Sequence, residues 1–164
     1  MSSDNQQHAL FPEPLEVRIA KLDATILALI MGHSGGPLGL QLSEDERKVL
    51  RLVRFARGAA NAVPLREVQS RTELDPRSIK QAVRNLRVNF RLPVGSAKSS
   101  SGGGYFLMIT AEDRALWTKD VLDQVRAEVA VLRAALGRQS TLELLGQLRM
   151  ELEATEGAEA HATL

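Results

Sequence analysis

Apolar residues recur at helical spacing near both ends of the chain. The first series alternates at intervals of four and three and predicts an amphipathic helix from Leu15 to about Met31, where a glycine-rich stretch follows: Leu15, Ile19, Leu22, Ile26 and Leu29. The second series predicts a long helix that begins after Thr110 and ends at Gly137: Leu122, Val125, Val129, Leu132 and Leu136. Ser140 and Glu143 then predict the start of a final helix.

Both series have the spacing of helices that pack along a continuous seam. They can meet within one chain or across a two-fold axis, and the pattern is compatible with either arrangement. We favour a homodimer, in which the contacts would come from Leu15, Ile19, Leu22, Ile26, Leu122, Val125, Val129 and Leu132.

The middle of the chain predicts three shorter helices. Ser43 and Glu46 form a capping-box pattern that starts a helix continuing toward Gly58. Pro64 opens a short helix to about Arg71, and Asp75 with Pro76 starts a third that reaches about Asn89. The buried stripe of this third helix would be Ile79, Ala82, Val83 and Leu86. Two helices joined by a short turn form a helix-turn-helix arrangement.

The tract that follows alternates between apolar and glycine-rich sequence. We expect a strand over 91–94 and a partner strand over 105–109. Between them, AKSSSGGG is too polar to pack in a core and too rich in glycine to form a helix. The tract therefore predicts a two-stranded hairpin, or wing, beside the helices.

Charge is segregated along the chain although the net charge is only +1. Residues 47–98 contain 13 Lys or Arg and three Asp or Glu, whereas the remainder holds 8 bases and 17 acids. A central region with a net charge of +10 predicts a polyanionic partner for that region.

The stretch PLREVQSRTELDPRSIKQAVRNLR, followed by LPVG, a polar loop and GGYFL, resembles winged helix-turn-helix DNA-binding domains. It is most similar to the DNA-binding domain of the bacterial biotin repressor and to phage-type regulators. The resemblance covers residues 44–110 only, and the ligase domain of biotin protein ligases is absent. It implies a mainly helical fold of three helices and a β wing, flanked here by the long amphipathic helices.

In such domains the second helix of the motif enters the major groove. The residues expected to read base edges are Arg77, Gln81, Arg84 and Asn85, because arginine pairs with guanine and amides pair with adenine. Phosphate contacts are expected from Ser78, Lys80, Arg87, Lys98 and Ser99.

Other chemistry finds no support in the sequence. GHSGGP resembles the nucleophile motif of chymotrypsin-like proteases, but His33 replaces its acid and no triad partners are evident. The three histidines are scattered and cysteine is absent, so we expect no metal, no cofactor and no enzymatic activity. The first residues lack a signal-peptide pattern and no run is long enough to span a membrane, which predicts a cytoplasmic protein.

The expected organisation has five segments: a disordered tail (1–14), an amphipathic helix with a glycine-rich loop (15–42), a winged helix-turn-helix domain (43–110), dimerising helices (111–156) and a second disordered tail (157–164). The predicted function is sequence-specific binding of double-stranded DNA by a dimeric transcriptional regulator. The alternatives are a DNA-binding protein of phage or plasmid replication or partition, and a winged module that contacts proteins. The sequence does not identify a small-molecule effector.

Overall fold

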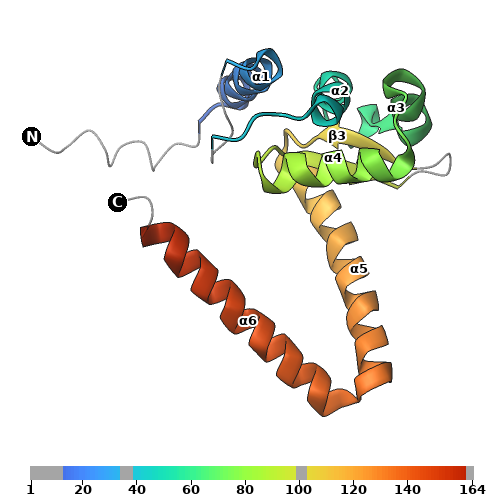
Figure 1. The fold of residues 1–164 in the computed structure, drawn as a ribbon, viewed down its shortest axis with the longest axis vertical. Coiled ribbons are helices and arrows are strands. Elements are labelled where there is room, and N and C mark those ends of the chain that lie inside the picture. The colour runs from blue at the N-terminus through green and yellow to red at the C-terminus, as the bar shows by residue number, and fades with distance from the viewer. Residues whose placement is uncertain (1–12, 34–38, 99–102, 162–164) are drawn as a thin grey trace, which may run out of the picture. The chain divides into compact units, whose positions relative to one another are not determined.

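The computed structural model describes residues 13–33, 39–98 and 103–161, which fold mainly as helices with a small antiparallel sheet (Figure 1). Residues 1–12, 34–38, 99–102 and 162–164 lie outside the described residues; they include most of the predicted tail 1–14, part of the predicted loops, and the last residues of the predicted tail 157–164. The elements in chain order are α1 (Leu15–Met31), α2 (Glu44–Val53), η2 (Ala59–Asn61), β1 (Val63–Pro64), α3 (Leu65–Thr72), α4 (Pro76–Val88), β2 (Val94–Ala97), β3 (Gly104–Leu107), α5 (Ala111–Leu136) and α6 (Arg138–His161). The chain divides into two compact units, Met1–Trp117 and Thr118–Leu164.

Local signals set the helix starts of the first unit. Both bonds of the capping box are present: Glu46 N–H donates to the Ser43 hydroxyl at 3.2 Å, and Ser43 N–H donates to Glu46 Oε2 at 2.8 Å. α1 ends at Gly32, whose φ of 71° lies in the left-handed region that glycine adopts without strain. The predicted bounds of α1 are confirmed.

α2 is shorter than predicted. It ends at Val53 rather than near Gly58, and Phe55 is exposed instead of continuing the apolar side. Here the backbone leaves the helix to pair with the sheet, since Leu107 N–H donates to Ala56 O at 2.7 Å and Gly58 N–H donates to Leu107 O at 3.0 Å. The polar groups of this backbone are thus satisfied by β3 instead of by another helical turn.

The sheet has three strands in the order β1-β3-β2, one more than the two-stranded wing predicted. Val63 pairs with Tyr105 on one side of β3, and Val94 pairs with Leu107 on the other. The strand expected at 91–94 begins only at Val94, because Leu92 N–H donates to Leu86 O at 3.0 Å and holds this stretch against the end of α4.

One core unites the helices and the sheet of the first unit. The apolar face of α4 packs with α2, α3, β2 and β3, and its members Ile79, Val83 and Leu86 are at most 1% exposed. Ile26 of α1 lies in the same core and Leu22 packs against it. Ile26 is 1% exposed within one chain, so the core of its own unit already covers this side chain, which was predicted as a dimer contact.

A carboxylate anchors the start of α5 to the core. Asp113 accepts hydrogen bonds from the backbone N–H groups of Ala59, Ile109 and Thr110 at 3.1–3.2 Å. Partial burial raises the pKa of Asp113, but these bonds lower it by more, so the pKa lies below its ordinary value. Trp117, further along α5, packs against the cluster formed by Ala56, Phe106 and Met108.

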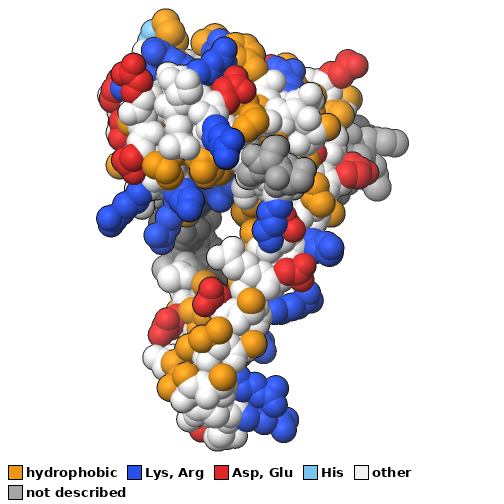
Figure 2. Space-filling model, turned by 90° about the vertical axis from the view of Figure 1, so that its right-hand side faces the viewer, with side chains coloured by type: hydrophobic (Ala, Val, Ile, Leu, Met, Phe, Trp, Pro, Cys, Tyr) orange, Lys and Arg blue, Asp and Glu red, His pale blue; other side chains and the backbone are white. Residues whose placement is uncertain are grey.

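The second unit contains the rest of α5 and α6. None of its described hydrophobic side chains is buried. α6 starts at Arg138, two residues before the predicted Ser140, and runs to His161, beyond the predicted end at 156. Hydrophobic side chains are visible along the lower part of Figure 2, which these helices form. None of the helices in the described ranges is long and apolar enough to cross a membrane.

Candidate nucleic-acid interface

The turn between α3 and α4 is fixed by side-chain and backbone bonds. Glu73 adopts a left-handed conformation, with φ of 61°, directly after α3. Asp75 then caps α4 by accepting hydrogen bonds from Arg77 N–H at 2.8 Å and Ser78 N–H at 3.1 Å. The Ser78 hydroxyl bond and these backbone bonds hold the pKa of Asp75 below its ordinary value. The start of α4 is therefore held in one position relative to α3.

Opposite its buried stripe, α4 presents an outer face without acids. We define the outer face of α4 as four polar residues that are exposed on this helix, Arg77, Lys80, Gln81 and Arg84. Within the described part of the chain, Lys80 and Arg84 form no ion pair or hydrogen bond through their side-chain nitrogens. Three cations and one amide on a helix of fixed position can donate to phosphate oxygens or to base edges.

Gln81 and Asn85 belong to a hydrogen-bond chain that leads into the core. Gln81 Nε2 donates to Asn85 Oδ1 at 2.9 Å, and Asn85 Nδ2 donates to Glu46 Oε1 at 2.8 Å. The other Glu46 oxygen accepts from Ser43 N–H, and Glu46 is only 6% exposed. Asn85, predicted to read bases, is thus half-buried and engaged with α2, whereas Gln81 keeps one N–H and its carbonyl oxygen for a partner.

Two predicted phosphate contacts have other partners. Arg87 turns toward the sheet, where its Nε donates to Val94 O at 2.6 Å and its guanidinium carbon lies 5.2 Å from the Trp117 ring centroid. Burial lowers the pKa of Arg87 despite the nearby Tyr105, and burial also raises the pKa of Tyr105. Arg87 is therefore a packing residue of the wing rather than a surface cation.

Ser78 donates its hydroxyl proton to Asp75 Oδ2 at 2.6 Å. A phosphate oxygen is an acceptor and would need this proton, so the Ser78 side chain offers it no donor in this conformation. Lys98 is exposed at the end of β2, and Ser99 lies outside the described residues.

A hollow of about 320 Å³ separates the outer face of α4 from the start of α2. Arg77 and Gln81 line one side, and Asp45 and Glu46 line the other. The acids would repel a phosphate backbone at this place but can accept a hydrogen bond from a base. Glu46 was recognised in the sequence only as a cap, because its second partner, Asn85, is 39 residues away in the chain.

Among the described residues, no group of three His, Cys, Asp or Glu is placed to hold a metal ion. Neither a protein-family model nor a curated protein matches the sequence. Among solved structures, the chain is similar to Rv2887, a MarR family protein from Mycobacterium tuberculosis solved in complex with p-aminosalicylic acid. The two are 25% identical over 85% of this chain and 95% of that chain, with a TM-score of 0.29. Since this TM-score is too low to indicate a shared fold, we infer neither fold nor ligand from the similarity.

Proposed function

We propose that the protein binds double-stranded DNA with sequence preference and inserts α4 into the major groove. The observation that carries the proposal is the outer face of α4: basic and amide side chains, free of acids, on a helix whose opposite face is buried. Arg77, Gln81 and Arg84 would read base edges, and Asn85 would hold Gln81 in place. Lys80, Lys98 and Ser99 would contact phosphates. Arg87 and the Ser78 side chain would not, because Arg87 donates to Val94 O and the Ser78 hydroxyl donates to Asp75.

The protein acts as a homodimer in this proposal. Support comes from the second unit, where large apolar side chains stay exposed within one chain, among them Leu122 and Val125 at 47% and 49%. Val129 and Leu132 lie at the same helical spacing and are half-buried. A symmetric dimer would present two α4 helices about one DNA turn, roughly 34 Å, apart. Leu15, Ile19 and Leu22 of α1 stay predicted contacts of that dimer.

Selection from a random double-stranded DNA library tests the proposal. The full chain is compared with Arg77→Ala/Arg84→Ala and with the control Arg126→Ala/Arg133→Ala, which removes the same charge from α5. We expect the wild type and the control to enrich one two-fold symmetric site and the α4 variant to lose it.

The other outcomes separate the alternatives. Binding without enrichment would favour an architectural role, such as one in replication or partition, over a transcriptional regulator. No binding at moderate salt would contradict DNA recognition and favour a winged module that contacts an acidic protein. Once a site is known, Arg84→Ala should cost about 1–3 kcal/mol on it and relax the preference at one base pair.

A further inference from the structure

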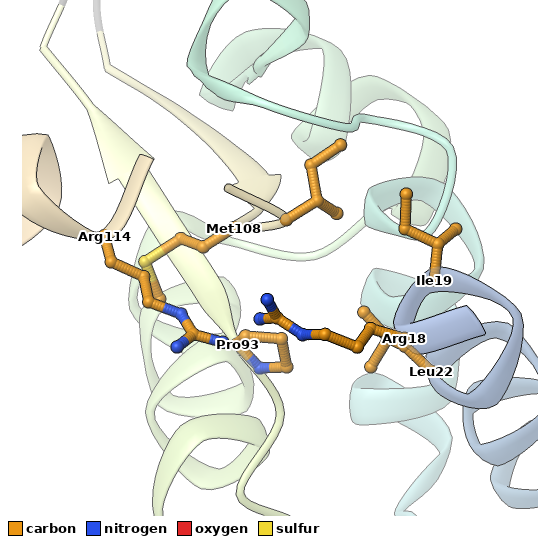
Figure 3. A pocket seen from close by; sticks show the side chains of 7 residues that line it. Arg18, Ile19, Leu22, Pro93, Met108 and Arg114 are labelled. Atoms are coloured by element: carbon orange, nitrogen blue, oxygen red, sulfur yellow. The ribbon is translucent and has the colours of Figure 1, made fainter. Parts of the chain in front are cut away.

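Two acids at the start of α2 lie beside the outer face of α4. The hollow of about 320 Å³ between these two helices has Arg77 and Gln81 on one side and Asp45 and Glu46 on the other. A second hollow, between α1 and the wing, differs in charge, because two arginines and, among the described residues, no acid line it (Figure 3). Acids are unfavourable next to a phosphate backbone, so their place beside a helix proposed to bind DNA needs a reason of its own.

Asp45 is the acid of this hollow whose carboxylate stays free for a partner. Glu46 is only 6% exposed, and its two oxygens accept from Asn85 and from the Ser43 backbone N–H. Asp45 is half-buried and forms no hydrogen bond or ion pair within the described part of the chain, not even with Arg77. Because the bond between Glu46 and Asn85 joins α2 to α4, Asp45 keeps its place beside α4. A base edge that approaches Arg77 would therefore also meet this carboxylate.

The chemistry of a carboxylate restricts the base that it can contact. A carboxylate accepts hydrogen bonds and donates none. In the major groove guanine presents two acceptors and thymine presents one, so a carboxylate would be repelled by both bases. Adenine presents an amino group with the N7 acceptor beside it, whereas cytosine presents its amino group alone. A free carboxylate beside α4 therefore favours cytosine over the other three bases.

We infer that Asp45 is a specificity-determining residue that accepts a hydrogen bond from the 4-amino group of cytosine, in or beside the base pair that Arg77 contacts. The inference rests on the proposed insertion of α4 into the major groove, and it adds a residue of α2 to the readout. The negative charge of Asp45 weakens the attraction to any phosphate backbone, so this residue improves discrimination while it lowers the affinity for unrelated DNA. If Asp45 only stabilised the start of α2 through the helix dipole, its removal would leave base preference unchanged.

Site selection from a random double-stranded DNA library tests the inference, with Asp45→Ala introduced into the full chain. Glu112→Ala is the matched control, because Asp45 and Glu112 both occupy the second position of a helix, and Glu112 is exposed on α5. On the enriched site, each cytosine is then replaced in turn by 2-pyrimidinone, which lacks the 4-amino group and still pairs with guanine. Circular dichroism verifies that each variant is folded.

The wild type and Glu112→Ala should enrich cytosine at one position of the site where Asp45→Ala accepts any base. The preferences at the other positions should be the same for all three proteins. Replacing that cytosine by 2-pyrimidinone should weaken binding by the wild type about tenfold and leave binding by Asp45→Ala unchanged. Asp45→Ala should also bind unrelated DNA more tightly than the wild type does, since one repulsive charge is gone.

The inference is overturned if Asp45→Ala keeps the wild-type preference at every position, or if Glu112→Ala loses the preference at the same position. Failure of the proposed function looks different, because the wild type itself would then enrich no site, and both proposals would be refuted together. A site that depends on Arg77 and Arg84 but not on Asp45 refutes this inference alone.

Discussion

The role of Asn85 can be decided by its effect on stability. If Asn85 only contacted DNA, its removal would leave the free energy of unfolding unchanged, since replacements of solvent-exposed residues stay within about 0.5 kcal/mol. The hydrogen bonds to Glu46 and Gln81 predict a different result for Asn85→Ala.

The expected loss follows from the partners of Asn85. Its bond to the Glu46 carboxylate is 2.8 Å long, and hydrogen bonds to charged groups contribute about 1.5–3 kcal/mol. Glu46 is 6% exposed, so its Oε1 atom would lose a donor that water does not easily replace. Alanine favours a helix interior over asparagine by roughly 0.5 kcal/mol, which offsets part of the loss. The net destabilisation should be about 1–2.5 kcal/mol.

Urea unfolding followed by circular dichroism measures this difference. Asn85→Ala should lower the midpoint without changing the slope, which would show that stability alone has changed. Arg84→Ala is the matched control: the neighbouring residue on the same helix is exposed and should unfold like the wild type. If Asn85→Ala unfolds at the same urea concentration as the control, the bond to Glu46 contributes nothing, and Asn85 returns to the residues proposed to read bases.

Three further perturbations test the packing around this site. Gly104→Ala should destabilise the fold by about 2 kcal/mol or more in urea unfolding, because its Cβ would lie 2.8 Å from the Val63 carbonyl oxygen. Gly146→Ala, in open space on α6, should instead be neutral or stabilise by up to about 1 kcal/mol, and equal effects would contradict this packing. Asp113→Asn should lower the free energy of unfolding by roughly 2 kcal/mol at neutral pH. Because the folded-state pKa of Asp113 is depressed, the stability contributed by its carboxylate is present above the unfolded pKa near 3.9 and is lost as pH falls through the folded-state pKa. The difference in stability between variant and wild type should therefore shrink in acid. Arg87→Leu should raise the pKa of Tyr105, the single tyrosine, further in an ultraviolet titration, since the Arg87 charge now lowers it; an unchanged or lower pKa would contradict their proximity.

Local sequence signals predicted the helices well because each is complete within a few residues. The start of α2 is specified by Ser43 and Glu46, whose side chains cap each other's backbone N–H groups three positions apart. The start of α4 is specified by the cap Asp75 and by Pro76, which restricts the backbone at the next position. The buried stripe of α4 follows from the 3.6-residue period alone, and all four predicted members are buried.

Features that depend on a distant partner were missed. β1 has only two residues, and it is a strand because Val63 meets Tyr105, 42 positions later. Arg87 has the same side chain as Arg84, one helical turn earlier, yet it meets the β2 backbone and Trp117 while Arg84 meets solvent. Residue type and helical angle predict which side of a helix a residue lies on, but not whether another element covers that side.

The difference between side chains that bond to another element and side chains that meet solvent also indicates which residues can change without loss of the fold. Glu46 joins the cap of α2 to Asn85, and Asn85 holds Gln81, so the core itself sets the orientation of one residue proposed to read bases. Among the described residues, Arg77 and Arg84 have no such link through their side chains. Replacing Arg77, Arg84 or Gln81 should therefore change the base preference without changing the stability. Replacing Asn85 should change both. Stability and site selection measured on the same four variants would separate these roles, because only a residue bonded to the core can move both quantities together.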